Sequence, residues 1–126
     1  MSQRALIAED NAALRTVIEF TVARAGFDIV AVENGKKALQ AAVDGEFDII
    51  ISDQQMPFLT GIEFCRELRK HEQRSETPFI LLTAKKLELD IRQLKEELAI
   101  SEVLAKPFSP QMLAALLCKL AAGVGC

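Results

Sequence analysis

The chain has 126 residues, of which half are apolar and about a quarter charged, and its net charge is −3. A chain of this length buries roughly two thirds of its unfolded surface, so it can fold as one domain without a disulfide or a structural metal. The acidic balance gives no general attraction for nucleic acid or for an anionic membrane, and we expect neither as a direct partner.

Apolar runs alternate with helical periods from the N-terminus onward. The run RALIAED at 4–10 is short and apolar, ends in acid, and predicts a strand. Apolar residues then recur at helical spacing until Gly26, which supplies a helix C-cap; they are Leu14, Val17, Ile18, Thr21, Val22 and Ala25. The run FDIVAVENG at 27–35 predicts a second strand that closes on an Asn-Gly turn, and a short helix follows from Lys36 to Val43.

The same alternation continues through the middle of the chain. Phe47 to Ser52 predicts a third strand, and a third helix follows Gly61 with Ile62, Cys65 and Leu68 on one face. PFILLT at 78–83 predicts a fourth strand. The segment KKLELDIRQLKEEL at 85–98 predicts a charged amphipathic helix, with a stripe formed by Leu87, Ile91, Leu94 and Leu98.

The last strand and helix complete the pattern. SEVLAK at 101–106 predicts a fifth strand, after which Ser109 and Pro110 open a helix as N-cap and first helical residue. The apolar stripe of this helix is Leu113, Leu116, Leu117 and Leu120. The chain contains five β/α units, and their strands are too apolar to have a solvent-exposed face. This pattern predicts a doubly wound α/β domain, in which helices cover both sides of a parallel sheet.

The sequence carries neither a membrane segment nor a zinc pattern. No window approaches about 18 consecutive apolar residues, and the start MSQRALIAED lacks the features of a secretory signal, so we expect a cytoplasmic location and no membrane partner. The cysteines are far apart and show no CxxC or Cys/His spacing. We expect Cys65 and Cys118 to be small apolar helix residues that form no disulfide.

Polar residues follow four of the five predicted strands at their carboxyl ends, where doubly wound sheets bind ligands. They are Glu9 and Asp10 after the first strand, Asp53 after the third, Thr83 after the fourth and Lys106 after the fifth. Right-handed crossovers bring these ends to one edge, so three carboxylates and one ammonium are expected in one pocket. Close carboxylates repel, so either one takes up a proton or a cation enters, and Mg²⁺ fits best.

Asp53 ends one of the most apolar strands of the chain, so the rigid sheet presents its carboxylate to the pocket. A carboxylate can act as a nucleophile and form an aspartyl phosphate. Lys106 and Thr83 are then placed to hold phosphoryl oxygens. Taken singly, an acidic residue at a strand end is normally a solvated loop residue, Lys106 an ordinary surface lysine and Thr83 a turn cap. Their convergence at one edge favours a site.

Together these residues resemble the receiver domains of two-component response regulators, and the resemblance covers essentially all of residues 1–126. The matching segments are the pair Glu9-Asp10, the run DQQMPFLTG with Asp53, Met56, Pro57 and Gly61, the pair Thr83-Ala84, and Lys106-Pro107-Phe108. The resemblance implies a flavodoxin-like fold with a five-stranded parallel sheet in the order 2-1-3-4-5.

The resemblance also implies a function for the site. Asp53 is expected to receive a phosphoryl group from a histidine kinase or phosphotransfer protein. Mg²⁺ is expected to be held by Asp10, Asp53 and the main-chain carbonyl of Gln55, with Glu9 assisting through water. Such domains are no enzymes in the usual sense, because they phosphorylate and dephosphorylate only themselves. A downstream protein target is expected to bind the face formed by the fourth helix, the fifth strand and the fifth helix.

One position departs from the family pattern. The family commonly has an aromatic residue three positions before the lysine, but this chain has Val103 there and contains no Tyr or Trp. Val103 is short, β-branched and stiff at χ1, so it cannot sweep the volume of a ring. We therefore expect the signal to travel mainly as a backbone shift of the loop at 84–89.

Three other functions stay open. A phosphatase of the haloacid dehalogenase type needs a second aspartate two residues after the nucleophile, where this chain has Gln55, and usually a cap domain. A flavodoxin-like cofactor carrier needs a phosphate-binding loop after the first strand, where AEDNAAL would repel phosphate. A receiver that no longer accepts phosphate would act as a constitutive interaction module, against which the complete set of site residues argues.

Overall fold

The computed structural model describes residues 3–85 and 89–120 of the protein. Within them, five parallel strands form one sheet in the order β2-β1-β3-β4-β5. This arrangement confirms the predicted doubly wound, flavodoxin-like fold and its strand order. The elements are β1 (Gln3–Ala8), α1 (Ala12–Arg24), β2 (Phe27–Val32), α2 (Gly35–Asp44), β3 (Ile49–Asp53), α3 (Gly61–Arg69), a 3₁₀ turn η1 (Glu72–Arg74), β4 (Phe79–Thr83), α4 (Ile91–Leu98), β5 (Glu102–Ala105) and α5 (Pro110–Leu120).

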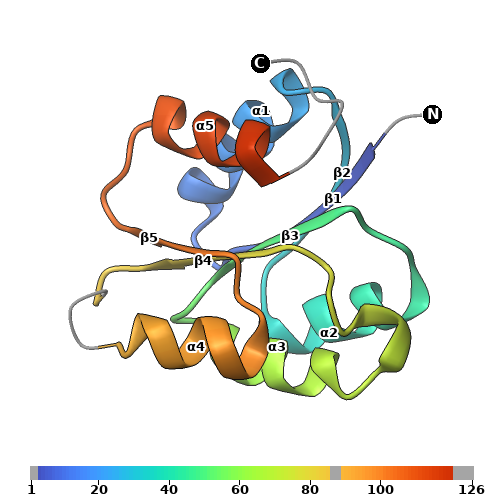
Figure 1. Ribbon diagram of the computed structural model, residues 1–126. Helices are drawn as coiled ribbons and strands as arrows, with labels where there is room; N and C mark the ends of the chain where they lie inside the picture. The colour runs from blue at the N-terminus through green and yellow to red at the C-terminus, as the bar shows by residue number, and fades with distance from the viewer. Residues whose placement is uncertain (1–2, 86–88, 121–126) are drawn as a thin grey trace.

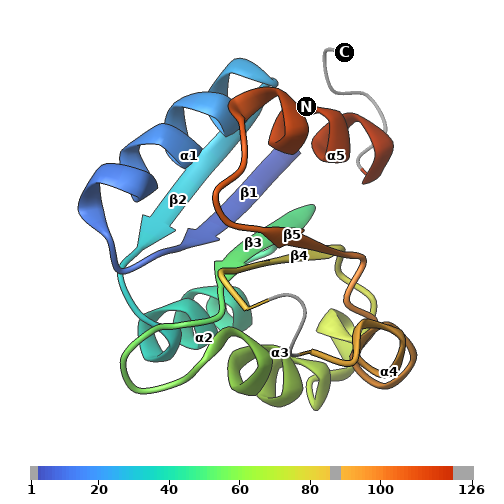
Figure 2. The same cartoon turned by 90° about the vertical axis from the view of Figure 1, so that its left-hand side faces the viewer.

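The sheet separates two layers of helices (Figures 1 and 2). Helices α1 and α5 cover one face, and α2, α3 and α4 cover the other. A hydrophobic core lies on each face of the sheet. Alternate residues of each strand pack into one core or the other, since successive side chains of a strand point to opposite faces. Ile49 and Ile51 of β3 belong to the core under α1 and α5, whereas Ile50 belongs to the core under α2, α3 and α4. Every residue of β3 and β4 is buried, as expected for central strands of a parallel sheet.

Side chains at the helix ends explain where most helices begin. Asn11 and Asn34 cap α1 and α2 by accepting from the main-chain N–H groups of Leu14 and Lys37. Thr60 and Glu63 form a reciprocal capping box at the start of α3, which satisfies two free N–H groups. Gly26, with a φ of 105°, follows the end of α1 in the left-handed region, as the sequence predicted.

The fourth helix is shorter than predicted. We expected a helix over 85–98, but α4 begins at Ile91, because the side chain of Asp90 accepts from the N–H of Gln93 and caps the helix there. Ahead of it, the main-chain N–H of Lys85 donates to the Thr83 hydroxyl in a turn. Leu87, predicted on the stripe of this helix, lies outside the described residues.

Two smaller expectations also need correction. Val17 belongs to the predicted stripe of the first helix, but its side chain is 46% exposed. Cys65 is a free, buried thiol as expected, whereas Cys118 of α5 is disulfide-bonded, so the prediction is wrong for that residue. Within the described ranges, none of the helices combines the length and apolar character that a membrane crossing needs.

Candidate functional site

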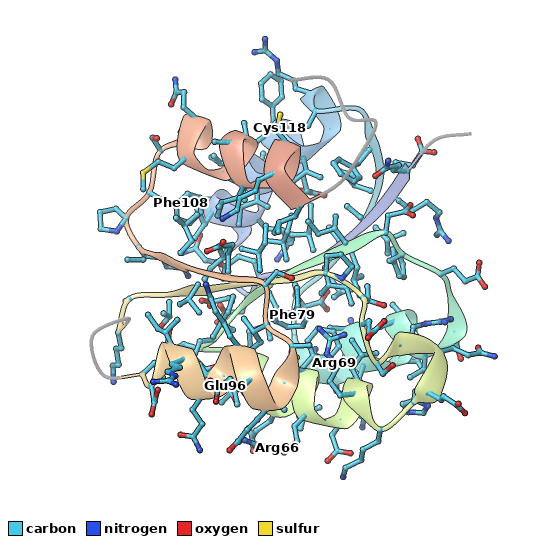
Figure 3. The ribbon with its side chains drawn as sticks, viewed as in Figure 1. Arg66, Arg69, Phe79, Glu96, Phe108 and Cys118 are labelled. Carbon is cyan, nitrogen blue, oxygen red and sulfur yellow. The ribbon has the colours of Figure 1, made fainter. Side chains whose placement is uncertain are left out.

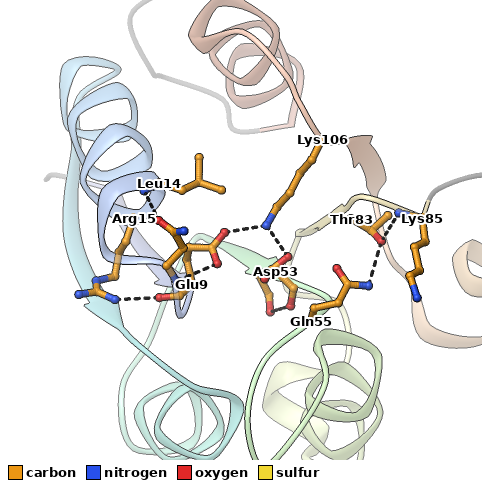
Figure 4. A network of polar contacts seen from close by, with 10 residues as sticks. Glu9, Leu14, Arg15, Asp53, Gln55, Thr83, Lys85 and Lys106 are labelled. Atoms are coloured by element: carbon orange, nitrogen blue, oxygen red, sulfur yellow. Dashed lines mark hydrogen bonds and ion pairs between the residues drawn. The ribbon is translucent and has the colours of Figure 1, made fainter.

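The carboxyl ends of four strands meet at one edge of the sheet (Figure 4). Main-chain hydrogen bonds just beyond the strands fix their relative positions: Glu9 N–H donates to Val32, Gln54 N–H to Leu82, and Lys106 N–H to Thr83. Because the sheet is parallel and in register, the residues that follow the strands are carried to the same place. Glu9, Asp53 and Lys106 point toward one another there.

Lys106 lies between the two buried carboxylates of this edge. Its Nζ atom is 2.9 Å from Glu9 Oε1 and 2.8 Å from Asp53 Oδ1. The contact with Glu9 is a hydrogen bond, whereas the one with Asp53 is an ion pair without hydrogen-bond geometry. Asp53 Oδ1 is therefore a buried oxygen that finds no hydrogen-bond donor among the described residues.

Burial decides the protonation of Glu9, whose side chain is fully enclosed. Loss of water raises the pKa of Glu9 from 4.5 to about 7, and the charge of Asp53 adds to this effect, although the bond from Lys106 opposes it. Burial by itself lowers the pKa of Lys106, but its pairing with Asp53 and Glu9 outweighs burial and raises that pKa. The lysine thus stays charged, and Glu9 holds a proton more readily than an ordinary glutamate does.

The donor set fits a hard divalent cation. Glu9, Asp10 and Asp53 each offer one carboxylate oxygen, and these oxygens lie within 4.8 Å of one another. Asp10 is exposed while the other two are buried, so the cluster opens to water on one side. Mg²⁺ prefers oxygen ligands and keeps several waters, and Asp53 Oδ1, which pairs with Lys106 but accepts no hydrogen bond from the described residues, can serve as one of its ligands.

Thr83 and Gln55 lie on the opposite side of Asp53 from Glu9 (Figure 4). The Thr83 hydroxyl is buried and accepts from the N–H of Lys85 at 3.0 Å and from the side-chain amide of Gln55 at 3.4 Å. Since its oxygen accepts these contacts, its own hydrogen remains free to donate. The family resemblance implied a metal-binding role for the main-chain carbonyl of Gln55, and that role stays a prediction.

Sequence reasoning missed the residues that hold the two loops of the site. Gln54 accepts from the N–H groups of Gly61 and Ile62, through its main-chain carbonyl at 3.1 Å and its side-chain Oε1 at 2.8 Å, and so closes the loop after β3. Arg15 donates to the main-chain carbonyl of Glu9 at 2.9 Å. Neither contact has a recognised sequence signal, although Arg15 and Glu9 are only 6 positions apart and Ile62 and Gln54 only 8.

Gly61 also fits tightly against the site. A Cβ atom at this position would lie 2.5 Å from the main-chain oxygen of Asp53, closer than real Cβ atoms come. Only glycine therefore lets α3 begin this close to the end of β3.

A comparison with protein families identifies the class of the chain. The family model of the response regulator receiver domain matches residues 5–117, so the chain belongs to this family and is a receiver domain of a two-component system. Over 111 residues, the chain is 34% identical to the alkaline phosphatase synthesis transcriptional regulatory protein PhoP of Bacillus subtilis. The matched region covers 88% of this chain and 45% of that protein. The chain thus spans about half the length of this curated relative.

Solved structures agree with this assignment. The chemotaxis response regulator CheY4 of Vibrio cholerae superposes with a TM-score of 0.86 at 30% identity, over 95% of this chain and 99% of that one. The receiver domain of the sensor histidine kinase PA1611 of Pseudomonas aeruginosa superposes with a TM-score of 0.84 at 32% identity, over 95% of this chain and 98% of that one. That structure has a magnesium ion coordinated in its active-site cleft.

Proposed function

We propose that Asp53 is the phosphoacceptor of this receiver domain and that Asp10, Asp53 and the main-chain carbonyl of Gln55 hold Mg²⁺, with Glu9 acting through water. The observation that carries the proposal is the cluster of carboxylate oxygens within 4.8 Å, in which Asp53 Oδ1 is buried without a hydrogen-bond donor. The magnesium ion bound to the PA1611 receiver domain supports the same assignment. When bound, Mg²⁺ neutralises charge on the transferring phosphoryl oxygens.

The residues of the chain have distinct parts in the transfer. A carboxylate oxygen of Asp53 attacks the phosphorus of the donor, an oxygen–phosphorus bond forms, and the donor atom leaves with the electrons of the bond that breaks. Lys106 already contacts Asp53 at 2.8 Å, so its ammonium is placed to pair with a phosphoryl oxygen. The Thr83 hydroxyl has a free hydrogen to donate to a second oxygen.

We propose that all 126 residues form one receiver domain, whose chemistry is limited to gaining and losing this phosphoryl group. The donor is a histidine kinase or a phosphotransfer protein, and the downstream partner is a protein that binds the face of α4, β5 and α5. Val103 of β5 is buried in the core cluster that also contains Leu98 and Ile100. Because this side chain is short, it cannot replace the moving aromatic ring of other receivers. The phosphorylation signal therefore travels through a backbone shift of the loop after Thr83.

An intact-mass measurement after incubation with acetyl phosphate, with and without Mg²⁺, tests the proposal. We expect one phosphoryl adduct that requires Mg²⁺ and is labile to hydroxylamine, as an acyl phosphate is. Asp53→Asn should abolish the adduct, because the amide is a poor nucleophile and removes a charge from the metal site. Labelling that persists in Asp53→Asn would refute the assignment of the acceptor. A wild-type protein that takes no phosphoryl group would favour a constitutive interaction module.

A further inference from the structure

Arg15, near the start of α1, reaches back to the end of β1 (Figure 4). Its Nη1 atom donates to the main-chain carbonyl of Glu9 at 2.9 Å. This carbonyl lies beyond the strand ladder, whose last pair at this end joins Ala8 of β1 to Val32 of β2. A main-chain carbonyl that loses water without gaining a donor costs free energy. Arg15 supplies the donor that the strand ladder does not.

The bond from Arg15 restrains the peptide unit that precedes Asp10. A peptide unit is planar, so the carbonyl of Glu9, the N–H of Asp10 and the Cα atoms of both residues lie in one plane. On the other side of Glu9, its N–H donates to the carbonyl of Val32 at 3.1 Å. Because the carbonyl is held as well, this plane cannot turn freely, and the position of the Asp10 Cα atom is restricted.

The peptide unit that follows Asp10 is held by a second contact. The N–H of Asn11 belongs to this unit and donates to Glu9 Oε2 at 3.3 Å. The other carboxylate oxygen of Glu9 accepts from Lys106 at 2.9 Å. The carbonyl of Asn11 in turn accepts from the N–H of Arg15 at 2.8 Å. The backbone is therefore bonded on both sides of Asp10, and Arg15 provides the bond on the N-terminal side.

The side chain of Asp10 has no support of its own. It is exposed, and within residues 3–85 and 89–120 its carboxylate makes no hydrogen bond or ion pair. One of its oxygens nevertheless lies within 4.8 Å of carboxylate oxygens of Glu9 and Asp53. Repulsion between close carboxylates favours an outward position for the exposed one. The place of Asp10 in the cluster therefore depends on the backbone that carries it.

We propose that Arg15 is a positioning residue of the metal site: its bond to the carbonyl of Glu9 orients the peptide unit that carries Asp10. This unit then directs the Asp10 carboxylate into the cluster that it forms with Glu9 and Asp53. The inference rests on the proposed binding of Mg²⁺ at this cluster and adds a residue outside the ligand set. Arg15 itself is no ligand, because a guanidinium has no acceptor atom.

The charge of Arg15 and its bond to Glu9 act on Mg²⁺ affinity in opposite directions. A nearby cation repels Mg²⁺, so removal of the charge alone would strengthen binding. Removal of the bond frees the peptide unit before Asp10, so Mg²⁺ must order it on binding and the affinity falls. Loss of a group that orients metal ligands typically lowers metal affinity about 10- to 100-fold. The direction of the change in affinity therefore separates positioning from simple electrostatics.

Arg15→Met tests the proposal, because it keeps an unbranched side chain and removes the guanidinium. In calorimetric titrations with Mg²⁺, its Kd should rise on the order of 10-fold. In reactions with acetyl phosphate, the Mg²⁺ concentration that gives half-maximal labelling of Asp53 should rise by a similar factor. The rate at saturating Mg²⁺ should stay within about twofold of the wild type, because Arg15 bonds the carbonyl of Glu9 and not the reacting groups. Arg15→Lys keeps the charge and a donor, so its Kd should lie between those of the wild type and Arg15→Met.

Arg69→Met is the matched control. Arg69 is another half-buried arginine that holds main-chain carbonyls, and it lies at the end of α3 (Figure 3). Its Nε donates to the carbonyl of Leu98 and its Nη2 to that of Thr77, both at 2.7 Å. These carbonyls precede β5 and β4, so they lie at the amino ends of the strands, away from the carboxylate cluster. Arg69→Met loses the same charge and the same kind of bond, but its Kd for Mg²⁺ should equal that of the wild type. If it does not fold, Arg24→Met at the exposed end of α1 takes its place.

Amide hydrogen exchange in EDTA measures the arrangement without metal or phosphate. The amide of Asn11 should exchange faster in Arg15→Met than in the wild type, because the turn around Asp10 is no longer held on both sides. Unchanged exchange at Asn11 in the folded variant would overturn the proposal. So would a Kd for Mg²⁺ at or below the wild-type value, or an equal rise in the control variant.

Two further outcomes separate the possible failures. If Arg15→Met does not fold, Arg15→Lys carries the same test: its shorter side chain should raise the Kd by a smaller factor, and a wild-type Kd would overturn the proposal. A wild-type protein that binds no Mg²⁺, or that forms no adduct on Asp53, defeats the proposed function instead. The exchange at Asn11 then still decides whether Arg15 holds the turn that carries Asp10.

Discussion

The buried carboxyl group of Glu9 makes the stability of this domain depend on pH in an unusual direction. Burial raises the pKa of Glu9 from 4.5 to about 7 in the folded protein. Between these two values the folded state keeps a proton that the unfolded state has lost. The free energy of unfolding should therefore fall as pH rises through this window, and level off above pH 7.

The magnitude follows from the size of the shift. Each pKa unit corresponds to 1.36 kcal/mol, so Glu9 should remove about 3 kcal/mol of stability between pH 4.5 and pH 7. Glu9 is fully enclosed, so solvent does not screen the effect. Mg²⁺ should reduce the dependence, because a bound cation favours the ionised carboxylates of Glu9, Asp10 and Asp53.

Urea denaturation in EDTA, followed by far-ultraviolet circular dichroism because the chain has no Trp or Tyr, measures this dependence. Glu9→Gln should flatten the curve between pH 4.5 and 7, because the amide does not titrate. Glu102→Gln is the control. Bonds from Lys119 and Lys95 lower the pKa of Glu102 below its usual value of 4.5 in the folded protein, so the stability that Glu102 contributes is lost only below pH 4.5, outside the window of Glu9. A wild-type curve that is flat or rises from pH 4.5 to 7, or a fall that survives in Glu9→Gln, would refute the reasoning.

Three further predictions concern the metal, the switch and the loop after β3. Asp10→Asn should lower Mg²⁺ affinity and the yield of phosphoryl adduct more than Glu9→Gln does, because Asp10 is the proposed direct ligand. Calorimetric titrations in which both variants bind Mg²⁺ like the wild type would contradict the proposed metal site. Thr83→Ala should still accept phosphate but show weaker amide shift changes over 83–89, part of which lies outside the described residues; shift changes equal to wild type would mean that the coupling takes another route. Gly61→Ala should cost about 1–3 kcal/mol in urea denaturation, since its Cβ would overlap the carbonyl of Asp53, and an unchanged midpoint would show that the loop yields freely.

The alternation of strands and helices could be predicted from the sequence because it depends on neighbouring residues. Apolar runs of strand length, helical spacing and end signals such as Gly26, Ser109 and Pro110 all act within a few positions of one another. The same local patterns placed Asp53, Thr83 and Lys106 at strand ends, and the parallel topology then required these ends to meet at one edge. Fold class and the identity of the candidate site residues therefore follow from the amino-acid sequence by itself.

Tertiary structure decided the features that depend on distant parts of the chain. The bond between Lys106 and Glu9 joins residues 97 positions apart, and the raised pKa of Glu9 follows from its enclosure by several elements. Arg69 reaches Leu98 across 29 positions, although in sequence it is only one more arginine at the end of a charged helix. Local sequence patterns do not indicate such contacts, because burial and charge pairing arise only when the β/α units pack together.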